Sequence, residues 1–236
     1  MFVMQNRNKD LLKMWAKEYH QVAFIANDPI QFPHRFTEKQ DIEISAFVTS
    51  YLSFGNRKQI IKKVDHLHDM MGDSPEEYVR KGSFFNDIPN NDSSFYRTIS
   101  NKAILELFAT LRDIYDQVQS MEEALKRSNG IPMERLCRLF SVSSKSPQKK
   151  MNMFLRWMIR GNSPVDFGLW NHFDARDLII PLDTHVVQMS YQLGLTDTTS
   201  YTLKNALRIT EALTKVFPED PCLGDFALFG YGVNHA

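Results

Sequence analysis

Apolar residues recur at helical spacing along almost the whole chain, and this periodicity constrains the fold more than any other feature. The stretch 41–54 places five large apolar side chains on one face, at i, i+3, i+4, i+7 and i+8 spacing: Ile44, Phe47, Val48, Tyr51 and Leu52. Such a stripe is typical of a helix that buries one face. Ser74-Pro75 opens a later helix, with a capping serine followed by proline at the first helical position.

Further helices are predicted over most of the chain, separated by two polar, turn-rich loops. The helices are expected at about 56–71, 93–119, 121–127, 133–140, 149–160, 184–193, 202–216 and 222–231, and the loops at 82–94 and 161–174. The one short β-like run is 178–182, where Pro181 favours an extended segment that fills a core over a paired strand. We therefore expect an all-α fold.

The composition excludes several classes of protein. A length of 236 residues with 43% hydrophobic and 24% charged residues is typical of a folded globular protein of one or two domains. Cys137 and Cys222 lie far apart, which excludes zinc ribbons, four-cysteine iron–sulfur clusters and secreted disulfide scaffolds. Because no signal peptide or long apolar run is present, we expect a soluble protein with no membrane contact. The two isolated cysteines favour a reducing cytoplasm. We also expect a monomer that holds no metal or cofactor.

The net charge of +0 conceals a basic segment. Nine lysines and arginines but a single acid, Glu134, lie between Lys126 and Arg160, for a net charge of +8. The residues before this segment carry a net charge of −3 and those after it −5. Such a segment can form a phosphate-binding surface, although many basic helices are only solvated faces. Both interpretations remain open at this point.

An aspartate follows an apolar run at a predicted helix start, in Pro-Leu-Asp-Thr-His-Val over 181–186. By itself Asp183 is interpreted as a helix cap, a role that contributes about 1 kcal/mol. With Leu-Gly-Leu over 193–195, the segment also resembles the catalytic-aspartate element of the helix-hairpin-helix DNA glycosylase superfamily, which includes endonuclease III and the 8-oxoguanine glycosylases. This resemblance implies a two-domain helical fold with a cleft between the domains, and it assigns Asp183 as a catalytic carboxylate.

The same superfamily carries a nucleophilic lysine that opens an earlier helix, with Asn or Asp three residues later. Lys149 with Asn152 matches that spacing, and Lys150 is the alternate nucleophile. The positive end of the helix dipole and the neighbouring cations disfavour the protonated form of such a lysine, as an amine nucleophile requires. Without the resemblance, both lysines would be interpreted as ordinary surface residues.

Six residues are predicted to contact DNA. Asn56 and Arg57 lie where the superfamily places its strand-penetrating loop, although a turn capped by Asn56 explains them equally well. The remaining four belong to the basic segment: Arg135, Arg138, Lys145 and Gln148. The superfamily hairpin reads Gly-x-Gly before the lysine, whereas this chain has Pro147 and Gln148, and Pro147 has no N–H to offer a phosphate.

A second resemblance covers most of the 236 residues. Segments 51–60, 152–158 and 225–230 resemble the bacterial family known as domain of unknown function 2400. This similarity is specific, but it carries no activity with it.

The glycosylase resemblance implies both a domain organisation and a function. Residues 30–160 would form one domain, and 1–29 with 161–236 the other, so that Lys149 and Asp183 would come from different domains. Because one sugar must contact both, their head groups should lie within about 10 Å. The expected protein is a base-excision repair glycosylase acting on double-stranded DNA, with a lysine-dependent lyase step left open. The alternative is a non-catalytic nucleic-acid-binding protein that keeps the fold.

Overall fold

The computed structural model describes residues 5–235, and their regular structure is almost entirely helical, which confirms the predicted all-α class. The chain forms two compact units. The central unit is Asp28–Ser128, and the terminal unit combines the chain up to Asn27 with the chain from Asn129 onward. Among residues 5–235, no helix has both the length and the apolar character needed to cross a membrane.

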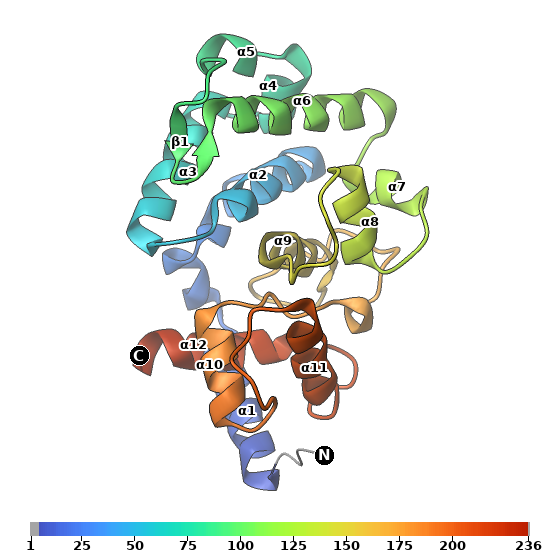
Figure 1. Cartoon of the computed structure of the whole chain (residues 1–236). Helices are drawn as coiled ribbons and strands as arrows, with labels where there is room; N and C mark the ends of the chain where they lie inside the picture. The colour runs from blue at the N-terminus through green and yellow to red at the C-terminus, as the bar shows by residue number, and fades with distance from the viewer. Residues whose placement is uncertain (1–4, 236) are drawn as a thin grey trace. The chain divides into compact units, whose positions relative to one another are not determined.

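The central unit contains six α-helices, two short 3-10 helices and one small hairpin within its described residues (Figure 1). In chain order these are η2 (Pro29–Gln31), η3 (Pro33–Arg35), α2 (Lys39–Leu52), α3 (Arg57–Met71), α4 (Pro75–Lys81), α5 (Phe84–Asp87), β1 (Ser94–Tyr96), β2 (Ile99–Ser100), α6 (Asn101–Gln117) and α7 (Met121–Lys126).

Helix α2 forms the core of the central unit. Four residues of its predicted apolar stripe are buried, with Ile44 and Val48 fully excluded from solvent, while Tyr51 is half-buried. The helix is also buried on its other sides because α3, α4 and η3 pack around it. Glu43 is therefore fully buried, and its carboxylate accepts hydrogen bonds from the Tyr115 hydroxyl at 2.7 Å and the Met121 N–H at 2.9 Å. These bonds replace the water that burial removes.

A β-hairpin replaces the start of the helix predicted at 93–119. Strands β1 and β2 pair antiparallel, and α6 begins only at Asn101, where the Ser100 hydroxyl accepts the Ala103 N–H at 3.2 Å. The loop predicted at 82–94 contains the four-residue helix α5. The sequence prediction was wrong at these two places because short segments of this kind depend on tertiary packing more than on periodicity.

The terminal unit joins both ends of the chain. Its elements are α1 (Asn6–Tyr19), η1 (Val22–Asn27), α8 (Pro132–Leu139), α9 (Lys149–Ile159), η4 (Ala175–Asp177), α10 (Thr184–Gln192), α11 (Leu203–Thr214) and α12 (Leu223–His235). Helix α1 packs against α12, where Trp15 stacks on Tyr231 with ring centroids 3.8 Å apart (Figure 1). Gly230 makes this approach possible, since a Cβ there would lie 2.4 Å from the Tyr19 ring.

The apolar run 178–182 is extended and buried, as predicted. Ile180 is fully excluded from solvent, and its N–H donates to the Thr210 hydroxyl on α11 at 3.1 Å. Because this segment is fixed in the core and ends directly before α10, it holds Asp183 at the start of that helix.

Candidate active site

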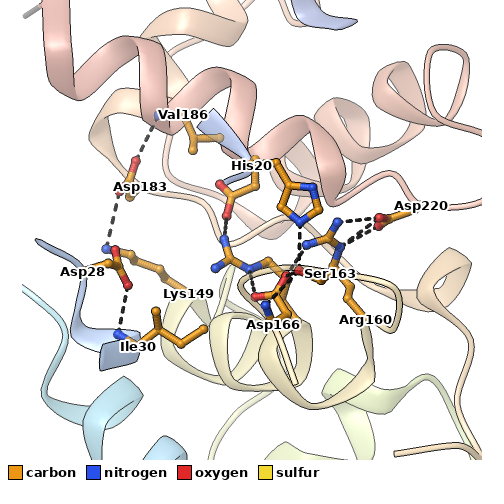
Figure 2. A network of polar contacts seen from close by, with 12 residues as sticks. His20, Asp28, Ile30, Lys149, Arg160, Ser163, Asp166, Asp183, Val186 and Asp220 are labelled. Atoms are coloured by element: carbon orange, nitrogen blue, oxygen red, sulfur yellow. Dashed lines mark hydrogen bonds and ion pairs between the residues drawn. The ribbon is translucent and has the colours of Figure 1, made fainter. Parts of the chain in front are cut away.

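Asp183 has two separate interactions, one for each carboxylate oxygen. As the N-cap of α10, it accepts the Val186 N–H through Oδ1 at 2.9 Å. Its Oδ2 lies 3.5 Å from Nζ of Lys149 (Figure 2). The capping role inferred from the sequence is therefore confirmed, and it leaves the second oxygen facing the lysine.

Lys149 is the first residue of α9, so its ammonium group extends from the positive end of that helix. The distance to Asp183 satisfies the expected limit of about 10 Å between the head groups. The Lys149 side chain is 30% exposed and that of Asp183 13%, so the pair is reachable from solvent. Both residues belong to the terminal unit, whereas they were expected in different domains, because the unit boundary follows Ser128 and α9 lies beyond it.

Lys150, the alternate nucleophile, is half-buried at the same helix terminus. Burial, followed by the charge on the adjacent Lys149, lowers its pKa to about 8. A lysine with such a pKa has a substantial neutral fraction near pH 8, and the neutral amine is the nucleophilic form.

The loop before Lys149 has a backbone conformation that favours glycine. Gln148 has a φ of 45° and occupies the left-handed region. Its side-chain amide donates to the Ser143 carbonyl, and the Asn152 amide donates to the Pro147 carbonyl at 2.9 Å. Asn152 therefore anchors the backbone of Pro147, directly before Gln148.

Arg156 on α9 and Arg160, the residue that caps its C-terminus, form a buried ionic network, shown in part in Figure 2. The carboxylate of Asp166 bridges them, with Oδ1 3.3 Å from Arg156 Nε and Oδ2 paired with Arg160 Nη1. Asp225 on α12 also pairs with Arg156, and Asp220 receives Arg160 Nε at 2.9 Å. The two arginine side chains are 6% and 1% exposed.

This network changes the interpretation of the basic segment. Arg156 and Arg160 are two of its nine cations, but they neutralise buried acids and so cannot contact a phosphate on the surface. Sequence reasoning missed the network because its acids, Asp166, Asp220 and Asp225, lie outside the segment. The only feature of the sequence that could have indicated the network was the accumulation of acidic residues after residue 160.

Asp225 of this network and the neighbouring His20 have shifted pKa values. Burial raises the pKa of Asp225 to about 6, partly opposed by Arg156 and reinforced by the charge on Asp183. The His20 ring lies 2.8 Å from the Ser163 hydroxyl, and burial followed by the charge on Arg160 lowers its pKa to about 4. His20 is therefore neutral at neutral pH.

The predicted DNA-contacting residues of the basic segment lie near the surface of the terminal unit. Lys145 and Arg138 are exposed, and Arg138 donates to the Asn129 carbonyl. Arg135 is half-buried, donates to the Gly130 carbonyl at 2.6 Å and lies over the Phe173 ring at 5.3 Å.

Asn56 and Arg57 belong to the central unit. The Asn56 carboxamide caps α3 by accepting the N–H groups of Lys58 at 3.0 Å and Gln59 at 3.3 Å, while Arg57 is half-exposed. The capping alternative for Asn56 is confirmed, and a DNA contact by either residue stays a prediction.

The comparisons with known proteins identify a family. Residues 28–137 and 130–234 match the family described as protein of unknown function (DUF2400). No curated protein and no solved structure is detectably similar to the chain. Among residues 5–235, no group of three or more His, Cys, Asp or Glu side chains is arranged to hold a metal ion.

Proposed function

The chain belongs to this DUF2400 family, and we propose that it is a DNA base-excision glycosylase of the helix-hairpin-helix type with a lysine-dependent lyase activity. One observation carries the proposal. Lys149 and Asp183 are 34 residues apart in sequence, yet Nζ and Oδ2 are 3.5 Å apart, each at the N-terminus of its own helix.

A lysine and a carboxylate in this arrangement suit attack on a sugar. Asp183 accepts a proton from the Lys149 ammonium, and the neutral amine then attacks C1′ of a nucleotide extruded from the duplex. The bond between C1′ and the base nitrogen breaks, and the base leaves with that electron pair and takes up the proton that Asp183 received. The regenerated Asp183 carboxylate stabilises positive charge on the sugar and then accepts the second proton of the attacking nitrogen, which leaves a neutral aminal. When the ring opens, Asp183 returns this proton to the ring oxygen and the nitrogen lone pair forms a Schiff base on Lys149, the intermediate of a lyase.

The hydrogen bonds around the two residues also support the proposal. Oδ1 of Asp183 is fixed by the Val186 N–H, so Oδ2 is held toward the lysine without a large loss of side-chain freedom. The hydrogen bond from Asn152 fixes the backbone immediately before α9. Both groups are therefore positioned by rigid helix termini.

The decisive test is borohydride trapping on a duplex that contains an abasic site. The wild-type protein should form a covalent adduct, whereas Lys149→Met should reduce trapping at least 100-fold, an effect in the range of about 10²–10⁴ expected for a reacting group. Asp183→Asn should slow trapping in the same range while the asparagine still caps α10. Lys204→Met, which removes an equal charge from an exposed position on α11 outside the basic segment, is the matched control.

The outcomes separate the alternatives. Loss of the adduct in Lys150→Met but not in Lys149→Met would identify Lys150 as the nucleophile. If wild type binds the duplex and no adduct forms, the protein is instead the non-catalytic nucleic-acid-binding alternative. A lesion panel that includes 8-oxoguanine then identifies the base.

A further inference from the structure

The central unit carries a cavity that the proposed chemistry does not use. Its volume is about 390 Å³, and it lies between α3 and the β1–β2 hairpin. Its lining includes Gln59, Lys62, Lys63, His66, Phe95 and Arg97. Ligand pockets for small molecules occupy about 300–1,000 Å³, so the cavity can hold a nucleotide.

The lining concentrates positive charge. Lys62, Lys63 and Arg97 all face the cavity, His66 adds an imidazole, and none of the described lining residues is acidic. Lys63 lies over the Phe95 ring, with Nζ 4.1 Å from its centroid. Burial lowers the pKa of Lys63, so a bound anion would compensate for the water that its ammonium group has lost.

Arg97 is presented to the cavity at a conformational cost. It occupies the turn between β1 and β2 with a φ of 52°, a conformation that costs a residue with a side chain about 1–2 kcal/mol. Gly55 provides space for it, because a Cβ at that position would lie 2.6 Å from Arg97 Nη1. The Tyr96 hydroxyl donates to the Phe54 carbonyl at 2.7 Å and fixes the hairpin to the loop before α3. Because residues with a strained backbone cluster at binding sites, the left-handed conformation of Arg97 in this fixed hairpin indicates a role in binding.

We propose that this cavity binds the phosphate group of a nucleotide, with Arg97 and Lys62 as its principal ligands and Lys63 beneath it. Arginine and lysine are the side chains that recognise phosphate, arginine by paired N–H donors and lysine as a point charge. Gln59 and His66 add polar groups at the edge of the cavity. The phosphate belongs to a free mononucleotide or to a nucleic-acid strand, and the two sources are distinguished below. The site does not depend on the chemistry of Lys149 and Asp183.

Calorimetric titration of the full chain tests this proposal, with inorganic phosphate, adenosine 5′-monophosphate and adenosine as probes. We expect saturable binding of one phosphate or monophosphate and no binding of adenosine. Arg97→Gly, which suits the left-handed turn, and Lys62→Met, at an exposed position, should each weaken binding at least tenfold. Lys102→Met is the matched control: it removes an equal charge from the exposed surface of α6 outside the cavity and should change binding less than twofold.

The source of the phosphate follows from two single-stranded oligonucleotides that differ only in a 5′-phosphate. If the phosphorylated strand binds more tightly, the ligand is the end of a strand. If the two strands bind equally and more tightly than the monophosphate, the ligand is a backbone phosphate. If the monophosphate binds more tightly than either strand, the ligand is a free nucleotide. The proposal is overturned if no probe binds at about 10 mM, if adenosine binds as well as its monophosphate, or if Lys102→Met weakens binding as much as Arg97→Gly. Lys149→Met should leave the affinities for inorganic phosphate and for the monophosphate unchanged, so this site and the proposed glycosylase fail independently.

Discussion

Two ionic groups lie along helix α9, about two turns apart, and they differ in their exposure to solvent. At its first residue, Lys149 meets Asp183 in a pair that remains 30% and 13% exposed. Further along, Arg156 and Arg160 share Asp166 in a network whose arginines are at most 6% exposed. Arginine stays protonated in proteins, whereas lysine can release a proton when its surroundings disfavour the charge. The buried network therefore suits a structural role, and the accessible pair suits proton transfer and nucleophilic attack.

Removing the carboxylate that bridges the network should have the largest effect on stability. Asp166→Ala leaves two buried guanidinium groups short of a counter-charge, and we expect a loss of about 3–5 kcal/mol in the free energy of unfolding measured with urea. Asp183→Asn, which keeps the helix cap and breaks only a partly exposed pair, should cost less than about 1 kcal/mol. Equal losses of unfolding free energy in the two variants would show that the buried network and the exposed pair contribute equally to stability.

Acid should weaken the folded state through its neutral histidines. The pKa of His20 and of His68 is lowered to about 4 in the fold, chiefly by burial, from an ordinary value of 6.5. The unfolded chain therefore binds more protons between these values, and stability falls as pH falls through this range. Asp225 acts in the opposite direction, because its pKa is raised from 3.8 to about 6 and the folded state gains a proton first.

The fall in stability should accordingly begin as the pH drops through about 6.5 and continue to about pH 4 at a limited slope, because proton uptake by Asp225 offsets one of the two histidines. Urea unfolding at a series of pH values measures the slope. His20→Gln should flatten it by removing the histidine beside the network, and His68→Gln should do the same in the central unit. A slope that neither variant changes would contradict these assignments.

If the protein binds DNA, the affinity should depend on the cations of the basic segment that lie outside the buried network. With four phosphates neutralised by Arg135, Arg138, Lys145 and Lys150, the logarithm of affinity should fall with the logarithm of salt at a slope of about −3 to −4. Lys145→Ala should lessen this slope by about one and leave thermal stability unchanged. A slope near zero would show that the basic segment is only a solvated helix face.

The smallest effect is expected at the residue before Lys149. Gln148→Gly should relieve the left-handed strain and raise the free energy of unfolding by up to about 1 kcal/mol. Gln148→Ala keeps the strain, loses the bond to Ser143, and should not stabilise the protein. Stabilisation by alanine equal to that by glycine would exclude backbone strain as the cause.

Local features were predictable because their interactions lie close together in sequence. The stripe of α2 follows from side-chain periodicity, and the caps at Asp183 and Asn56 each bond N–H groups two or three residues away. The run 178–182 was predicted as extended and buried from Pro181 and its apolar neighbours. The hairpin at 94–100 was missed because Phe95, Tyr96 and Ile99 also fit a helical pattern, and only packing within the central unit selects the strand pairing.

The sequence by itself determined the helical class, the caps and the placement of Lys149 at a helix start, since backbone hydrogen bonds and periodicity act over a few residues. Tertiary structure alone decided which charges meet. It placed Lys149 3.5 Å from Asp183, buried Arg156 and Arg160 against distant acids, and brought Arg97 to the cavity beside α3. A charged residue type does not reveal its partner, because the same arginine can be solvated on a surface or neutralised in a core, and the packing of elements distant in sequence sets that difference.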